Sequence, residues 1–128
     1  MSKNRVIPYQ PIDLAEPADL LGEIRARRGG QLINLDRMLL HSEPVARGWN
    51  HFIGNIRQKL SLDPKLRELG MCGVAILNGA EYEFFHHAPP FLKAGGTQTQ
   101  VDALRRLGQK DFDKDCFSAT ENDALELT

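Results

Sequence analysis

The chain of 128 residues contains only two cysteines, Cys72 and Cys116, which lie far apart in the sequence. They form neither a C-x-x-C pair nor a group with the spacing of metal ligands. We therefore expect no disulfide and no cysteine metal site, as is usual in a reducing compartment. Cys72 lies in an apolar segment and is expected to be an inert small hydrophobic residue, whereas Cys116 lies in a charged segment and is reactive only if it is exposed.

Long apolar runs and an excess of one charge are also missing. No run approaches the roughly 18 apolar residues of a membrane-spanning helix, and no apolar stretch follows the basic residues near the N-terminus as in a secretory signal. Basic and acidic residues nearly balance, with 16 Lys and Arg against 17 Asp and Glu. Because nucleic acids and acidic membranes bind basic surfaces, we expect a cytoplasmic protein with neither among its partners.

The sequence lacks repeats, low-complexity tracts and any sustained alternation of polar and apolar residues that would indicate a β-strand. Its content of 41% hydrophobic and 26% charged residues is typical of a soluble globular protein. The length predicts one domain over residues 1–128. Its first part, residues 1–16, is expected to be an extended arm. We predict an all-α fold, a compact bundle of about six helices.

Helix start and stop signals divide the chain. Helices are expected over residues 17–28, 32–41, 42–60, 63–77, 80–93 and 97–107. A further apolar segment starts near residue 118 and stops after about two turns, so we expect a truncated helix or one that docks on another subunit. The third helix has one continuous apolar face, made by Val45, Trp49, Phe52, Ile53, Ile56 and Leu60.

Two further features of these segments concern charge and proline. Arg25, Arg27 and Arg28 end the first helix and are expected to be solvated there. Pro89-Pro90 interrupts the fifth helix and is expected to kink it or to end its regular part.

The central segment, residues 63 to 95, holds most of the residues that can carry chemistry. Asp63-Pro64 is a typical helix start, and the apolar helix that follows carries Glu68 near its middle. A carboxylate removed from water needs a hydrogen-bonding or charged partner, although a Glu at the rim paired with Arg67 or Lys65 is an equally good interpretation. Asn78-Gly79 then allows a change of direction.

Two pairs of side chains on the next helix are four residues apart, Tyr82 with His86 and Glu83 with His87. Each pair shares a helix face. An acid four residues before an imidazole can orient the ring and fix its tautomer, as a general base or proton shuttle requires. Such a pair is far more often a surface pair on a helix, where it contributes only about 0.2–0.5 kcal/mol.

Metal binding is not expected from these residues. Glu83 and His86 have the Glu-x-x-His spacing of di-iron bundles, but those need a second such motif, which the chain does not contain. His86 and His87 are adjacent on a helix and point about 100° apart, so they do not bind one ion together.

The motifs L-R-E-L around Glu68 and G-A-E-Y-E-F-F-H-H around His87, followed by K-A-G, resemble the carboxymuconolactone decarboxylase and alkylhydroperoxidase D-like superfamily over about residues 35 to 107. The resemblance implies an alkylhydroperoxidase D-like fold with a central antiparallel helix pair. In the peroxidase branch, Cys residues occupy the positions of Ala80 and Glu83, and the Glu and His that serve them correspond to Glu68 and His87. The decarboxylase branch, which lacks the Cys pair, is the more similar one, although its tail is not seen after residue 107.

This resemblance implies a cofactor-free acid/base enzyme for a small carboxylated or lactone substrate. His87 would be the proton shuttle, Glu83 its orienting acid and Glu68 a relay. Tyr82, His86 and Trp49 are candidate substrate-binding residues, and neither a metal nor another cofactor is expected.

Two alternatives stay open at this point. One is a peroxiredoxin-like antioxidant activity, which would need Cys72 or Cys116 to replace the missing dithiol. The other is a catalytically silent scaffold or ligand sensor. Because relatives assemble, the resemblance also implies a homo-oligomer, whether dimer, trimer or hexamer.

Overall fold

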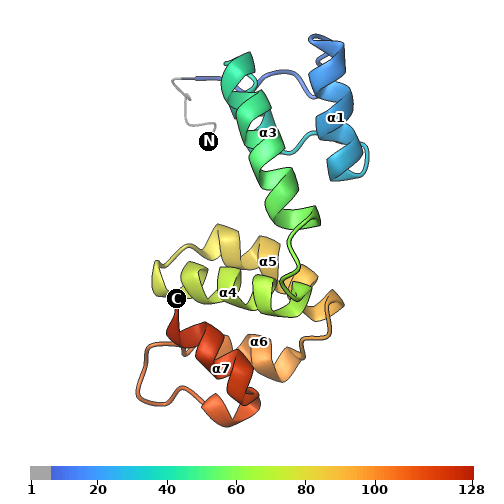
Figure 1. Cartoon of the computed structure of the whole chain (residues 1–128). Coiled ribbons are helices and arrows are strands. Elements are labelled where there is room, and N and C mark those ends of the chain that lie inside the picture. The colour runs from blue at the N-terminus through green and yellow to red at the C-terminus, as the bar shows by residue number, and fades with distance from the viewer. Residues whose placement is uncertain (1–6) are drawn as a thin grey trace. The chain divides into compact units, whose positions relative to one another are not determined.

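The computed structural model of the chain describes residues 7–128, and all of their regular structure is helical (Figure 1). The all-α prediction is therefore confirmed, with seven α-helices and one 3-10 helix in the described range. They are α1 (Ala18–Arg28), α2 (Asn34–Leu39), α3 (Glu43–Gln58), α4 (Pro64–Leu77), α5 (Glu81–Lys93), α6 (Gln98–Leu104), η1 (Lys114–Cys116) and α7 (Ala119–Glu126). Residues 1–6 of the predicted arm lie outside the described residues.

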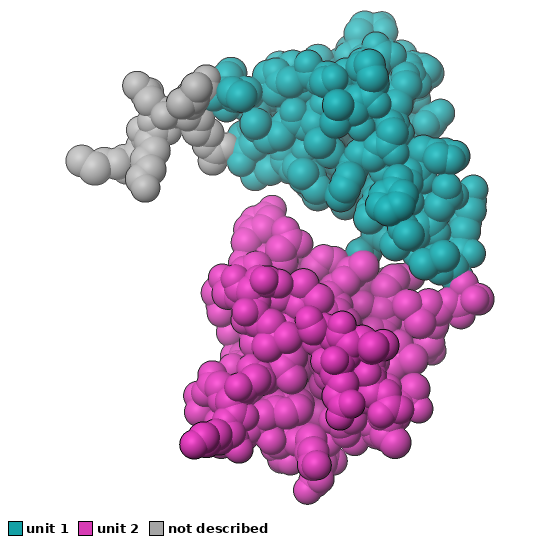
Figure 2. All heavy atoms as spheres, turned by 60° about the vertical axis from the view of Figure 1, so that its left-hand side comes forward, with its two compact units in different colours: residues 1–60 teal, residues 61–128 magenta. Residues whose placement is uncertain are grey.

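The chain forms two compact units, unit 1 over Met1–Leu60 and unit 2 over Ser61–Thr128, coloured separately in Figure 2. Unit 1 contains α1, α2 and α3, and unit 2 contains the remaining helices. Each unit has its own buried hydrophobic cluster. The single domain expected from chain length stays a prediction.

Unit 1 packs α1 and α2 against α3. Its core is small and aliphatic, and consists of Leu20, Leu21, Ile24, Leu32, Leu40 and Ala46. The residues that α3 buries are Ala46 and Asn50, whereas Val45 and Phe52 on its apolar face are 53% and 59% exposed. The strongest apolar stripe of the sequence therefore contributes little to the core of unit 1.

A buried carboxylate supports this small core. Asp36 is 2% exposed and accepts hydrogen bonds from Nε and Nη2 of Arg28, both at 3.0 Å, and from the backbone N–H of Ile33 at 3.1 Å. Arg27 Nη2 lies 3.7 Å from the same carboxylate, and the Arg27 side chain is 8% exposed. The expectation that Arg27 and Arg28 are a solvated helix end is thus wrong, because both guanidinium groups turn inward to compensate a buried acid.

The described part of the N-terminal arm is not helical up to Pro17 and packs on unit 1. Arg37 Nε donates to the carbonyl of Gln10 at 2.6 Å, and Arg25 Nη2 donates to the carbonyl of Leu14 at 2.8 Å. Arginine side chains thus satisfy backbone carbonyls that have no helical partner.

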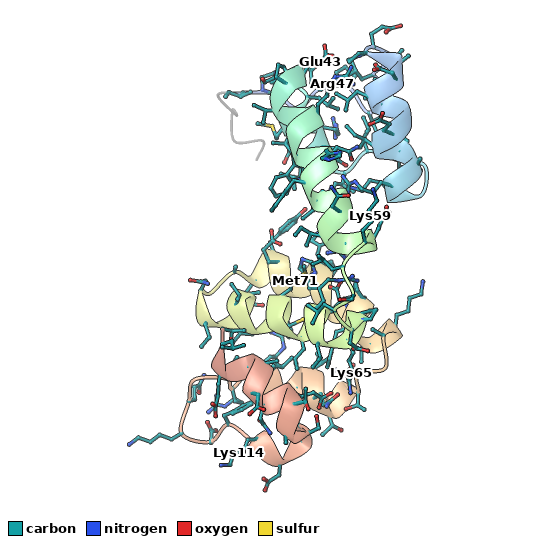
Figure 3. All side chains as sticks on the ribbon, in the orientation of Figure 1. Glu43, Arg47, Lys59, Lys65, Met71 and Lys114 are labelled. Atoms are coloured by element: carbon teal, nitrogen blue, oxygen red, sulfur yellow. The ribbon has the colours of Figure 1, made fainter. Side chains whose placement is uncertain are left out.

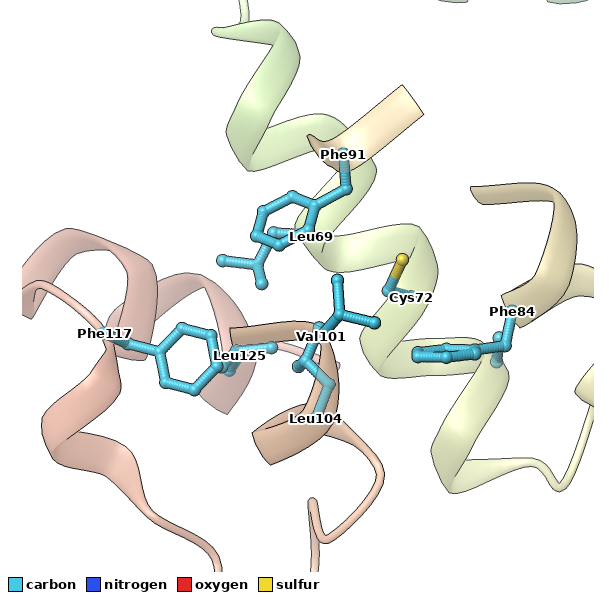
Figure 4. Close-up of a cluster of buried hydrophobic side chains, with 9 residues drawn as sticks. Leu69, Cys72, Phe84, Phe91, Val101, Leu104, Phe117 and Leu125 are labelled. Atoms are coloured by element: carbon cyan, nitrogen blue, oxygen red, sulfur yellow. The ribbon is translucent and has the colours of Figure 1, made fainter. Parts of the chain in front are cut away.

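Unit 2 is organised around α4 and α5, which are joined by a short turn and pack against each other, while α6 and α7 also contact α4. Gly79 adopts a φ of 64° in the turn, a conformation that glycine reaches without a Cβ clash. The core contains three phenylalanines and is shown in Figure 4; its members are Leu69, Cys72, Ala75, Phe84, Phe91, Val101, Leu104, Phe117 and Leu125.

Helix α5 continues through Pro89 and Pro90 to Lys93, so the proline pair does not end it. Proline lacks the N–H that would bond to the carbonyl four residues earlier, and these carbonyls belong to Phe85 and His86. Both residues are exposed, so water can satisfy the carbonyls that the prolines leave unpaired.

The last helix docks on its own unit. Ser118 and Glu121 form a capping box at the start of α7, and Lys65 of α4, labelled in Figure 3, contacts Glu121 with an Nζ to Oε1 distance of 2.5 Å. Gln100 of α6 donates to the same Glu121 side chain at 3.1 Å. Leu125 is consequently buried, although the sequence left it without an identified partner.

Candidate functional site

Glu68 lies in the middle of α4 and is 1% exposed. Its Oε1 accepts a hydrogen bond from Nε of Arg67 at 3.3 Å, and its Oε2 lies 2.8 Å from Nδ1 of His87 on α5. The packing of α4 against α5 brings these residues together across 19 positions of sequence. The buried carboxylate therefore has both a cationic partner and an imidazole partner.

The contact between Glu68 and His87 determines how the ring can act. An ionised carboxylate only accepts hydrogen bonds, and Arg67, a permanently charged donor, already donates to the other oxygen of Glu68. Beside an ionised Glu68, Nδ1 of His87 carries the proton and donates it to the carboxylate, so a neutral ring keeps its lone pair on Nε2. That nitrogen is the atom available for proton transfer.

Glu83 lies on the other side of the His87 ring. Its Oε2 is 3.6 Å from Nε2, beyond hydrogen-bond distance, and the Glu83 side chain is 58% exposed. The His87 side chain is 19% exposed. The structure thus places His87 between a buried carboxylate that holds it and a solvated carboxylate within reach of its second nitrogen.

A groove of about 780 Å³ opens beside this pair and is built entirely from unit 2. Helices α4, α5 and α7 all contribute to its wall, and most of the lining is apolar. The lining residues are Leu62, Leu66, Arg67, Gly70, Met71, Val74, Ala75, Asn78, Ala80, Glu83, His87, Thr120, Asp123, Ala124, Leu127 and Thr128. A volume of this size is typical of small-molecule sites.

The three predicted catalytic residues are brought together, but the three predicted substrate-binding residues are not among the residues that line the groove. Tyr82 is 59% exposed, and its ring lies against that of His86 with 4.3 Å between centroids. Trp49 belongs to unit 1, where it borders a small cavity together with Arg27 and Asp36. Their role in binding stays a prediction.

Sequence reasoning missed two parts of the site. Arg67 was considered only as a partner of Glu68 at a solvated rim, whereas its side chain is 17% exposed and lines the groove. Asp123 and Ala124 of α7, together with Leu127 directly after that helix, form part of the wall. The apolar residues after the Ser118 cap indicated that α7 packs on something, but a local pattern does not identify the helix it contacts.

Both cysteines are free thiols. Burial, together with the nearby charge of Glu68, raises the pKa of Cys72 to about 12. The hydrogen bond that Cys116 Sγ donates to Asp113 at 3.2 Å raises the pKa of Cys116 as well. Because the thiolate is the nucleophilic form, neither residue is activated for attack on a peroxide.

Within residues 7–128, no group of three or more His, Cys, Asp or Glu side chains has an arrangement that could hold a metal ion. In the same range, no helix has both the length and the apolar character needed to cross a bilayer.

The fold and the site together define a helical protein in which a buried glutamate holds a histidine beside an apolar groove. The model of the carboxymuconolactone decarboxylase family matches residues 43–127, which is more than half of the chain. The chain therefore belongs to the carboxymuconolactone decarboxylase family. No curated protein and no solved structure matches it.

The matched region begins with α3 and includes all helices of unit 2. It extends beyond residue 107, where the resemblance seen in the sequence ended, and so includes α7. The helix that closes the groove is therefore part of the family domain.

Proposed function

We propose that the protein is a cofactor-free acid/base enzyme that moves a proton to or from a small lactone or carboxylated substrate bound in the groove. The observation that carries this proposal is the 2.8 Å contact between Glu68 Oε2 and His87 Nδ1 beside the groove. A histidine held in one tautomer by a buried carboxylate presents its other nitrogen as a general base, and after protonation as a general acid.

The contact distances suggest a role for each residue. Glu68 is the orienting acid, because it is buried and makes the shorter contact with the ring. Arg67 compensates the charge of Glu68 in the dry interior. Glu83, which the sequence favoured as the orienting acid, is better suited to exchange the proton with solvent, because it is exposed and 3.6 Å from Nε2.

Solvent-deuterium exchange into carbon-bound positions of a panel of lactones, followed by NMR, tests the proposal. His87→Ala should slow the exchange by about 10²- to 10⁴-fold, the usual contribution of a general acid or base. His51→Ala is the control, because His51 is an exposed histidine of α3 in unit 1 and does not line the groove; its rate should stay within about twofold of wild type. Equal rates in the wild-type and His87→Ala proteins across the panel would contradict the assignment.

A thiol-dependent peroxidase activity has less support. Ala80 and Glu83 occupy the positions of the dithiol in the peroxidase branch, and the pKa values of both remaining thiols are raised rather than lowered. Peroxide consumption by the wild-type protein that disappears in the Cys72→Ser, Cys116→Ser double variant would restore this alternative.

A further inference from the structure

The charges around the groove indicate which substrates it accepts. Two carboxylates, Glu83 and Asp123, belong to the lining, and Glu68 lies directly behind His87. Arg67 is the one permanent cation among the lining residues, and its Nε is directed to Glu68. A bound anion would therefore meet a net negative charge, and because Glu83 and Asp123 are exposed, salt screens their part of the repulsion.

The rest of the wall is mostly apolar; its uncharged polar residues are Asn78, Thr120 and Thr128, and Asn78 Nδ2 and Thr128 Oγ1 already donate to backbone carbonyls. Leucine, methionine, valine and alanine side chains make up most of it, and several of them are largely uncovered: Leu62 is 47%, Val74 45% and Leu127 89% exposed. Covering such side chains with an apolar ligand yields about 25 cal/mol for each Å² removed from water. The groove thus favours a ligand with an extended apolar body.

We propose that the groove takes an uncharged lactone or related carbonyl compound with an apolar chain, and that it discriminates against carboxylated substrates. This inference rests on the proposed function only in that His87 and Glu83 mark where the reacting group would lie. The proposed acid/base chemistry at His87 would serve either a lactone or a carboxylated substrate, and the charges of the groove favour the uncharged lactone. Its consequence is that the reaction would be a proton shift on a neutral lactone and not the loss of carbon dioxide.

Asp123 is the residue that sets this discrimination. It lies on α7, away from the Glu68 and His87 pair in sequence, and its exposed carboxylate adds negative charge to the groove wall. Glu126 lies on the same helix and is equally exposed, but it does not line the groove. The two positions therefore form a matched pair for charge reversal.

Binding of γ-decalactone and of the sodium salt of its ring-opened hydroxy acid, two probes with the same carbon chain, tests the proposal by calorimetry. The wild-type protein should bind the lactone at least about tenfold more tightly than the salt, and added salt should reduce this ratio by screening the repulsion. Asp123→Lys should reduce the ratio severalfold, whereas Glu126→Lys should leave it within about twofold.

Three results would overturn the proposal: equal or tighter binding of the carboxylate by the wild-type protein, equal effects of Asp123→Lys and Glu126→Lys, or no binding of the lactone at millimolar concentration. The binding ratio is measured without turnover, so its failure is distinct from that of the acid/base assignment. If the ratio holds while His87→Ala exchanges protons as fast as wild type, the groove is assigned correctly and the catalytic role is not.

Discussion

Asp36 in unit 1 and Glu68 in unit 2 are the most deeply buried carboxylates of the described residues, with exposures of 2% and 1%. Both have arginine partners, but their remaining contacts differ. Asp36 is held by Arg28 through two hydrogen bonds and by a backbone N–H, all of them permanent donors. Glu68 has a histidine, whose second nitrogen is left for other groups. Burial alone therefore does not distinguish the two acids; the titratable partner of Glu68 and the groove beside it do.

The apolar residues of the two units differ as well. Unit 2 buries three phenylalanines, whereas unit 1 has an aliphatic core and leaves Val45 and Phe52 of α3 largely exposed. A small core gives less hydrophobic stabilisation, so unit 1 should depend more on its ion pair. This difference predicts that removing the charge of Asp36 mainly lowers the free energy of unfolding. Removing the charge of Glu68 should mainly lower the rate of the proposed proton transfer.

The largest effect on stability is expected for Asp36→Asn. The substitution leaves Arg27, whose side chain is 8% exposed, and the partly buried Arg28 without their counter-charge, and breaking a buried pair in this way costs about 3–5 kcal/mol. Glu68→Gln should cost less, about 1–3 kcal/mol, because the amide oxygen can still accept from His87 and only one arginine, Arg67, loses its counter-charge. Urea unfolding measures both values, and an Asp36→Asn cost no greater than that of Glu68→Gln would remove the distinction between the two acids.

A smaller, pH-dependent effect is expected for Glu121, a third buried acid. Burial raises the pKa of Glu121, but the hydrogen bonds from Lys65 and from the Ser118 N–H outweigh it and hold the pKa below its usual value of 4.5. A carboxyl whose pKa is lower in the folded state contributes stability above the unfolded pKa, and this stability is lost as pH falls through the folded value.

The free energy of unfolding of the wild-type protein should therefore fall below about pH 4.5. Glu121→Gln should remove about 1 kcal/mol near neutral pH and flatten this part of the profile. Glu126→Gln, an exposed position on the same helix, is the control and should leave the profile unchanged. If the free energy of unfolding of Glu121→Gln still falls below about pH 4.5 as in the wild-type protein, groups other than Glu121 cause this loss.

Much of the fold could be predicted because its signals are local. Asp63 caps α4, and capping boxes begin α6 at Thr97 and α7 at Ser118, as the sequence indicates. The persistence of α5 through Pro89-Pro90 could not be predicted, since it depends on the exposure of the preceding turn. The division into two units could not be predicted either. The apolar face of α3 indicates that this face packs on something, but it does not identify the segment that covers it.

The site was only partly predictable for the same reason. Helical spacing predicted that Glu83 and His87 share a face, yet the shorter contact of His87 is with Glu68, which is on another helix. The apolar helix around Glu68 brought this acid to attention, and the family resemblance, rather than spacing, linked it to His87. Arg67 and the α7 wall follow from tertiary packing, for which no local pattern in the sequence is a signal.

The central claim is that Glu68 holds His87 in the tautomer that leaves Nε2 free, and ¹⁵N NMR of the histidine ring measures this directly. At a pH where the ring is neutral, the account predicts a protonated Nδ1 and an unprotonated Nε2 in the wild-type protein. In Glu68→Ala, which removes the acceptor, the tautomers should mix, while Glu83→Gln should leave the wild-type pattern intact. A wild-type His87 that carries its proton on Nε2, or a tautomer set by Glu83 and indifferent to Glu68, would contradict the account.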